Sequence, residues 1–260
     1  MFGLEVRDAE VMEILDGNAA AFEARRPAGS ATTLADAQQM IVDTIERMEV
    51  LTRGHHAMAD AVLDVAAGRA DSGRPARVLE VATGNGWLLT NVAARAERRG
   101  IAVELTGSDL NPDLVSTTQL RLERDGLPIE MIRADATDLS DLGDGSFDAA
   151  VMSLALHHLP ASIVSAALVE MDRVSGGGMM IIDIRRSLLA LVLAPLSLVT
   201  APNGGGRYAL HDTVATVRRS YTEPELRALL DDVGLGDGYR VGPLPVLHPQ
   251  RMLVSAIRPR

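Results

Sequence analysis

The sequence predicts an α/β protein built on a mostly parallel sheet. From residue 77 onward, short apolar runs alternate with segments whose apolar residues recur at helical spacing, the pattern of parallel strands joined by helices. The apolar run Val78-Leu79-Glu80-Val81 leads into the turn Gly84-Asn85-Gly86, and a helical stripe begins directly after it. Before about residue 71, apolar residues recur only at helical spacing, with no strand pattern. We therefore expect an N-terminal helical cap over 1–70 and one α/β domain over 71–260.

The N-terminal cap is expected to hold three helices. Apolar residues recur at helical spacing over 11–22 and again over 34–51. Thr33 with Asp36 three residues later resembles a capping box and predicts the start of the second helix. A third helix is expected over about 55–67, ending before a glycine-containing and proline-containing linker.

The α/β domain is expected to contain seven strands and four helices. The strands are predicted at about 77–81, 102–106, 129–133, 147–152, 179–183, 238–243 and 251–257. The helices are predicted at about 87–99, 111–125, 161–173 and 222–233. Ligands of such open sheets bind beyond the carboxyl ends of the strands. Five polar residues at these ends are therefore candidates: Glu80, Asp109, Asp135, Ser153 and Asp183.

The glycine turn favours a ligand that carries positive charge. Glycine can adopt φ > 0 and lets a ligand approach the backbone closely. A dinucleotide-binding turn uses a third glycine and places a pyrophosphate at the helix N-terminus, but the third position here is Leu89. Glu80, on the strand that leads into the turn, would repel an anion and attract a cation.

An acid followed by a Gly-x-Gly turn resembles the first motif of the class I S-adenosylmethionine (SAM) methyltransferases. Glu80, Gly84 and Gly86 match that motif, and Ala82 replaces the usual first glycine. The segments 147–160 and 171–178 look like later motifs of the family, so the resemblance covers about 77–184. It implies a Rossmann-like seven-stranded sheet with an antiparallel last strand, and SAM as the methyl donor that leaves as S-adenosylhomocysteine. The cofactor-binding residues that it implies are Glu80, Ala82, Thr83, Gly84, Gly86, Asp109, Leu110, Asp135, Ala136 and Ser153.

Asp109 and Asp135 each have a second interpretation. Asp109 precedes Asn111-Pro112, so it fits a helix N-cap as well as a carboxylate that accepts hydrogen bonds from both ribose hydroxyls. Its place one strand-helix unit after the glycine turn favours the ribose. In the resembled family, an acid with a small neighbour at the position of Asp135 holds the adenine. The alternative for Asp135 is a carboxylate that caps its own loop.

Methyl transfer requires few dedicated catalytic residues, because the protein mainly holds the nucleophile, the methyl carbon and the sulfur in line. A hydroxyl nucleophile gains from a general base, and His157 and His158 follow the fourth strand on the side of the expected site. These two are the candidate catalytic residues. The alternative is a loop histidine satisfied by backbone hydrogen bonds. No spacing of histidines and acids indicates a metal.

The amino-acid composition restricts the kinds of partner that the protein is expected to bind. A net charge of −10 makes binding to a phosphate backbone unfavourable, and a 3% aromatic content leaves few side chains for base stacking. The first 13 residues lack the pattern of a signal peptide, and the absence of cysteine suits a cytoplasmic protein. The apolar run 188–199 contains Pro195 and is too short to span a membrane. Within a lid or insert at about 185–221, this run would roof a pocket for a partly apolar small-molecule acceptor, or else bury a homodimer interface.

Three functions remain open at this point. The first is SAM-dependent methylation of a small molecule. The second is a protein of the same fold that binds SAM without transferring methyl, as a scaffold or as a catalyst that uses the sulfonium charge. The third, a nicotinamide oxidoreductase, is disfavoured by Glu80 and Leu89.

Overall fold

A computed structural model describes residues 7–8, 10–70, 73–196, 201, 205–244 and 251–256. By the contacts among its residues, the chain divides into two compact units. The sheet unit comprises residues 55–183, 223–246 and 251–260, and the helical unit comprises residues 1–54, 184–222 and 247–250.

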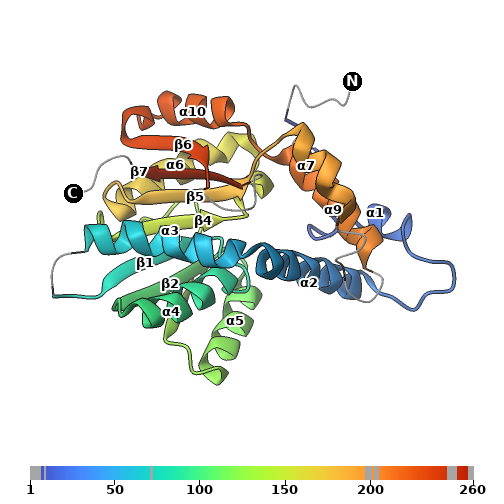
Figure 1. Cartoon of the computed structure of the whole chain (residues 1–260), viewed down its shortest axis with the longest axis horizontal. Coiled ribbons are helices and arrows are strands. Elements are labelled where there is room, and N and C mark those ends of the chain that lie inside the picture. Colours follow the sequence, from blue (N-terminus) through green and yellow to red (C-terminus); the bar gives the residue numbers. More distant parts are fainter. Residues whose placement is uncertain are drawn as a thin grey trace. The chain divides into compact units, whose positions relative to one another are not determined.

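The sheet unit is built on one seven-stranded sheet of order β3-β2-β1-β4-β5-β7-β6 (Figure 1). Its strands pair in parallel from β3 to β5, whereas β6 and β7 pair antiparallel. The predicted mostly parallel, seven-stranded sheet with a final antiparallel hairpin is thereby confirmed. The strands are β1 (Ala76–Val81), β2 (Val103–Asp109), β3 (Ile129–Arg133), β4 (Ala149–Ser153), β5 (Met179–Ile184), β6 (Tyr239–Pro243) and β7 (Arg251–Ala256).

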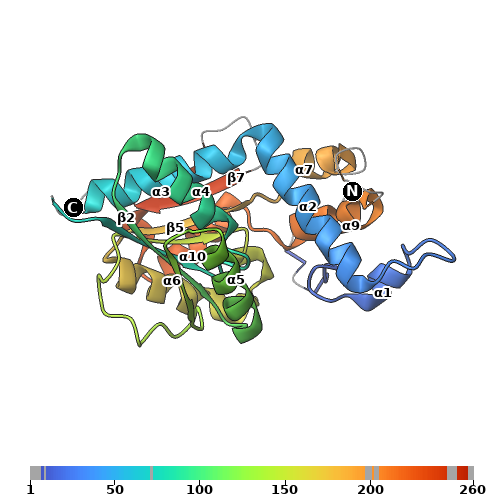
Figure 2. The ribbon, with the colours of Figure 1, turned by 90° about the horizontal axis from the view of Figure 1, so that it is seen from below.

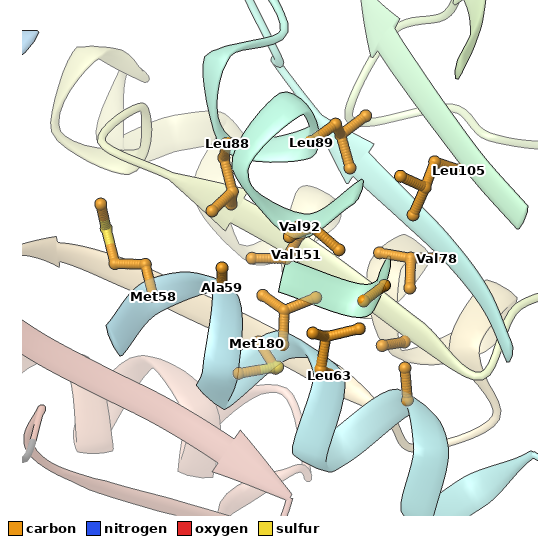
Figure 3. Close-up of a cluster of buried hydrophobic side chains, with 14 of the residues drawn as sticks. Met58, Ala59, Leu63, Val78, Leu88, Leu89, Val92, Leu105, Val151 and Met180 are labelled. Atoms are coloured by element: carbon orange, nitrogen blue, oxygen red, sulfur yellow. The ribbon is translucent and has the colours of Figure 1, made fainter. Parts of the chain in front are cut away.

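Helices cover both faces of this sheet. They are α3 (Gly54–Arg69), α4 (Trp87–Arg99), α5 (Pro112–Arg124), α6 (Ala161–Ser175) and α10 (Glu223–Asp232). Figure 2 shows α3 and α6 on opposite sides of the sheet. Side chains of α3 and α4 pack on alternate residues of the strands, as Figure 3 shows for Leu63 and Val92 beside Val78 and Val151. This burial of apolar side chains fixes α4, and with it the glycine turn that precedes α4.

The strand register places the polar strand ends at one edge of the sheet. Glu80 pairs with Gly107 of β2 and with Val151 of β4, and Ser153 pairs with Ile182 of β5. Because these strands are parallel, their carboxyl ends meet at the same edge. Glu80, Asp109, Ser153 and Asp183 therefore share the edge that the sequence indicates.

At the opposite edge, where the parallel strands begin, the buried Asp148 pairs with the half-buried Arg74. Asp148, just before β4, accepts hydrogen bonds from Arg74 Nη1 at 2.6 Å and Nη2 at 2.7 Å and from the Arg77 amide at 2.8 Å. Burial alone would raise the pKa of Asp148, but these donors outweigh it and hold the pKa below its usual value. Strand β4 begins at Ala149, two residues after the predicted start at about 147.

The helical unit contains α1 (Ala19–Glu23), α2 (Leu34–Thr52), α7 (Leu188–Leu193), the 3₁₀ turn Ala194–Leu196 and α9 (Gly206–Arg219). The predicted capping box is confirmed: Asp36 N donates to Thr33 Oγ1 at 3.1 Å, and Thr33 N donates to Asp36 Oδ2 at 2.8 Å. Helices α2 and α9 contact one another, and the rings of Phe22 and Tyr208 lie 5.8 Å apart in the unit's core.

The helix predicted over 11–22 is wrong for its first part, because only Ala19–Glu23 is helical. The amides of Ile14 and Leu15 donate instead to the buried carboxylate of Asp212, at 2.8 and 2.9 Å. Once these amides are held by a side chain of α9, they are not available for a helix. Helix α9 itself was not predicted.

The third predicted helix, α3, belongs by contacts to the sheet unit. The division at residue 70 into an N-terminal helical cap and an α/β domain, with a lid or insert at about 185–221, stays a prediction. Of the apolar run 188–199, the last three residues lie outside the described chain.

Candidate active site

Glu80 is the buried centre of the site. Its side chain is 1% exposed, and its carboxylate accepts hydrogen bonds from Thr83 Oγ1 at 2.6 Å and from Ser153 Oγ at 2.9 Å. Burial raises the pKa of Glu80 to about 7; the two hydroxyls and the Leu89 amide oppose this shift, while the nearby charge of Asp109 adds to it. Among the residues that the structure describes, the donors to Glu80 are all neutral. A ligand with positive charge would stabilise the ionised form.

The turn after β1 has a left-handed backbone at three positions. Ala82 has φ 55°, Gly84 57° and Gly86 69°. The left-handed region costs an alanine roughly 1–2 kcal/mol and costs glycine nothing, which explains why the resembled family has glycine at the position of Ala82. The replacement leaves the turn formed. Leu154, after the neighbouring strand β4, is also left-handed at φ 52°. Backbone strain of this kind is concentrated at functional sites.

The two glycines serve different purposes. A Cβ on Gly84 would have nothing within 4 Å, so this side of the turn is open to a ligand. A Cβ on Gly86 would lie 3.3 Å from Thr118 Cγ2, because α5 packs against the turn. Thr118 Oγ1 and Arg121 Nη2 also donate to the carbonyls of Gly84 and Asn85, at 3.2 and 2.5 Å. Helix α5 therefore holds the turn from one side while the other side stays accessible.

Asp109, the last residue of β2, joins that strand to the glycine turn. Its Oδ2 accepts from the Gly84 amide at 3.1 Å, and its Oδ1 accepts from the Asn111 amide at 3.0 Å. The N-cap of α5 is Asn111, whose side chain accepts from Asp113 N and Leu114 N. The alternative interpretation of Asp109 as an N-cap is therefore wrong. Its half-buried carboxylate is held in a fixed orientation beside the open face of Gly84.

The loop after β3 meets Asp109 through the backbone, because Ala134 N donates to the Asp109 carbonyl at 3.1 Å. Asp135 Oδ1 accepts from the amide and the hydroxyl of Thr137, at 2.9 and 2.8 Å, so it does cap its own loop. Asp135 is exposed and Ala136 half-buried, while Leu110 is 57% exposed. Their roles toward a cofactor stay predictions.

Gly107 of β2 packs directly beneath the glycine turn, against Thr83, and was not predicted as a residue of the site. A Cβ there would lie 2.8 Å from Met131 Sδ and 2.9 Å from Thr83 Cγ2. Only glycine therefore fits at this position without displacing its neighbours.

We expect Gly107→Ala to lower the free energy of unfolding by about 1–3 kcal/mol, because the core would be overpacked. Urea unfolding measures this effect. Gly143→Ala is the matched control, since its Cβ would meet nothing within 4 Å, and a change there within about 0.5 kcal/mol is expected. Equal losses in both variants would contradict this role of Gly107.

His157 lies on a 3₁₀ turn (Leu156–His158) after β4 and is paired with the end of β5. Asp183 Oδ1 is 2.7 Å from His157 Nδ1, and Asp183 Oδ2 accepts from the His157 amide at 3.0 Å. The His158 ring lies 4.1 Å from the His157 ring. The sequence predicted Asp183 at the same edge of the sheet but did not link it to His157. Strands β4 and β5 are neighbours in the sheet, so a residue just after β4 and a residue at the end of β5 are expected to lie close together. This neighbour relation would have predicted the contact of Asp183 with His157.

The sheet unit also matches a known family. Residues 78–178 match the family model of the methyltransferase domain. This segment is a methyltransferase domain. The match covers the glycine turn, Asp109, Asp135 and the His157 turn, and it confirms the resemblance to the class I enzymes. A demethylmenaquinone methyltransferase of Thermus thermophilus is 29% identical to the chain over 111 residues, which are 42% of the chain and 47% of that protein. The chain thus spans about half the length of this relative.

Solved structures extend the likeness of the methyltransferase domain to the fold. A SAM-dependent methyltransferase from Aquifex aeolicus has a TM-score of 0.52 at 20% identity, over 76% of this chain and 88% of its own. The plantazolicin methyltransferase BpumL in complex with SAH has a TM-score of 0.57 at 12% identity, over 94% and 100% of the two chains. At these identities the likeness concerns the fold, which is the predicted Rossmann-like methyltransferase fold.

Proposed function

We propose that the protein is a SAM-dependent methyltransferase that acts on a small molecule. The observation that carries this proposal is the buried carboxylate of Glu80, held by neutral donors, beside the open glycine turn and the fixed carboxylate of Asp109. A nucleoside with a positively charged side chain complements this set of acids, whereas a pyrophosphate does not.

The residues present fit SAM. The open face of Gly84 gives the cofactor access to the backbone, and Asp109 beside it offers acceptors for two ribose hydroxyls. Thr83 and Ser153 hold Glu80, and Ala82 and Gly86 shape the turn. Asp135, Ala136 and Leu110 would border the adenine. When bound, SAM supplies an electrophilic methyl group on a sulfonium, and its product is S-adenosylhomocysteine.

The acceptor that we propose is a partly apolar small molecule. In the helical unit, α7 exposes apolar side chains, with Leu188 52% and Val192 62% exposed. Such a surface suits an apolar acceptor or the interface of a homodimer. The net charge of −10 disfavours nucleic acid as substrate.

Among the described residues, no helix is both long and apolar enough to cross a membrane. We place the protein in the cytoplasm because a sequence without cysteine suits a reducing compartment.

Incubation with methyl-labelled SAM and a small-molecule extract of cells tests the proposal. We expect label in a low-molecular-weight product that depends on Asp109. Binding of SAM with no transfer to any extract component would instead favour a SAM-binding protein without methyl transfer. Binding of a nicotinamide dinucleotide in place of SAM would favour an oxidoreductase.

A further inference from the structure

The glycine turn contains a strained alanine, and helix α5 holds that turn by two of its carbonyls. We propose that Arg121, together with Thr118, is a positioning residue for the cofactor. These two residues, the α5 clamp, keep Ala82 in the left-handed conformation that glycine would adopt unaided. This inference rests on the proposed methyltransferase function and deepens it, because it names a residue away from the strand ends on which the affinity for the cofactor depends.

The first step is the strain at Ala82. This residue has φ 55° and lies in the left-handed region, which disfavours residues with a Cβ. A strained backbone of this kind persists only where the surrounding structure fixes it at several points. The contacts around the turn must therefore leave Ala82 no other conformation.

The second step is the set of contacts between the turn and β2. The Thr83 amide donates to the Ser108 carbonyl at 2.9 Å. The Gly84 amide donates to Asp109 Oδ2 at 3.1 Å. Strand β2 thus fixes two successive amides of the turn, but these bonds do not fix the carbonyls that follow.

Helix α5 holds the carbonyl side of the turn. Arg121 Nη2 donates to the Asn85 carbonyl at 2.5 Å, and Thr118 Oγ1 donates to the Gly84 carbonyl at 3.2 Å. The bond from Arg121 is the stronger of the two, because its donor is charged. Thr118 and Arg121 are three residues apart, so they lie on the same side of the helix. Together with the bonds to β2, the α5 clamp fixes the peptide groups that follow Ala82.

The Arg121 side chain is itself held in place beside the turn. Its guanidinium packs against Gly86, where a Cβ would lie 3.6 Å from Nη2. Its Nη1 donates to Asp125 Oδ2 at 3.3 Å. Because Asp125 offsets the charge of the guanidinium, the clamp adds little repulsion toward a cationic cofactor.

The third step links the clamp to cofactor binding. Gly84 offers its open face to a ligand only while the turn keeps its conformation beside Asp109. Without the bond from Arg121, Ala82 leaves the left-handed region in a share of the molecules, and the apparent affinity for SAM falls with the share that stays competent. Glycine at position 82 has no such strain to relieve. The clamp therefore predicts energetic coupling between positions 82 and 121.

A purely local role is the competing explanation, since the pair of Arg121 with Asp125 would also stabilise the last turn of α5. Arg121→Met keeps the aliphatic stem and a residue that favours helix, but it cannot donate. Arg124→Met is the matched control, because Arg124 pairs with the same Asp125, at 3.2 Å, from a side chain that is 74% exposed. Both substitutions remove one positive charge and one pair with Asp125. Only Arg121→Met also removes a bond to the turn.

The first measurement is amide hydrogen exchange of the full-length protein without cofactor, read by mass spectrometry in peptides that cover residues 82–88. We expect exchange in the turn to be about tenfold faster in Arg121→Met than in the unmodified protein and in Arg124→Met. In the double variant of Ala82→Gly and Arg121→Met, the rate should return to that of Ala82→Gly alone. Unchanged exchange in Arg121→Met, an equal increase in Arg124→Met, or fast exchange that persists in the double variant would overturn the proposal. This readout requires no SAM, so it is independent of the proposed function.

The second measurement is calorimetric titration of the same variants with SAM. We expect Arg121→Met to raise Kd about tenfold, the order of the strain that the clamp offsets, and Arg124→Met to leave Kd unchanged. In the Ala82→Gly background, the same Arg121→Met substitution should raise Kd by less than about twofold. Equal losses in the two backgrounds would overturn the proposal. Failure of SAM to bind to the unmodified protein would instead contradict the proposed function, and the exchange rates would still decide whether the clamp holds the turn.

Discussion

Asp109→Ala is expected to weaken SAM binding by about 10²–10⁴-fold. We assign two ribose hydroxyls to the Asp109 carboxylate, and hydrogen bonds to a charged acceptor contribute about 1.5–3 kcal/mol each, so their joint loss corresponds to this range. The substitution also removes the acceptor of the Gly84 and Asn111 amides, which loosens the turn against β2. Isothermal titration calorimetry measures the change in Kd.

Two control variants separate the causes of this loss. Asp109→Asn keeps one acceptor oxygen and should lose less affinity than Asp109→Ala. Asp113→Ala removes an exposed acid from the first turn of α5 and should leave Kd close to that of the unmodified protein. An unchanged Kd in Asp109→Ala would remove Asp109 from the cofactor site.

Glu80→Gln is expected to stabilise the protein without cofactor above pH 7 and to weaken SAM binding at least tenfold. The pKa of Glu80 is about 7 in the folded protein and about 4.5 when the chain is unfolded. Between these pH values the folded state binds a proton that the unfolded state has released, so stability falls as pH rises from about 4.5 to about 7. This shift corresponds to about 3 kcal/mol, which glutamine avoids because it does not ionise.

Urea unfolding at pH 5 and at pH 8 tests this prediction. The gain in the free energy of unfolding should reach about 2–3 kcal/mol at pH 8 and shrink toward zero near pH 5. The affinity of the unmodified protein for SAM should rise with pH up to about 7, because the cationic ligand prefers the ionised carboxylate. A Glu80→Gln variant that is less stable than the parent at pH 8 would show that the charge is already compensated within the protein.

The parts of the fold that depend on local pattern could be predicted from the sequence. The helix expected at 87–99 is α4 as observed, because Gly86 and the left-handed Gly100 delimit it at either end. The N-terminal segment shows the limit of this reasoning. Residues 11–18 have helical spacing, yet their conformation depends on Asp212, a residue 198 positions from Ile14 in the sequence. No local pattern contains that contact.

The candidate site divides in the same way. Glu80, Asp109 and Ser153 could be placed at one edge of the sheet from strand ends alone. Three other contacts could not be predicted: the Ser153 hydroxyl on Glu80, the packing of Gly107 beneath the turn, and the contact of Asp183 with His157. Each depends on which strands are neighbours and at what register. Sheet order, rather than sequence pattern, brings these residues together.

Calorimetric titration of the unmodified protein with SAM and, separately, with NAD tests the central claim most directly: that buried carboxylates beside a glycine turn recognise a cationic nucleoside. We expect saturable binding of SAM that is weakened by about 10²–10⁴-fold in Asp109→Ala, and no heat of binding for NAD. Saturable binding of NAD without binding of SAM would contradict it.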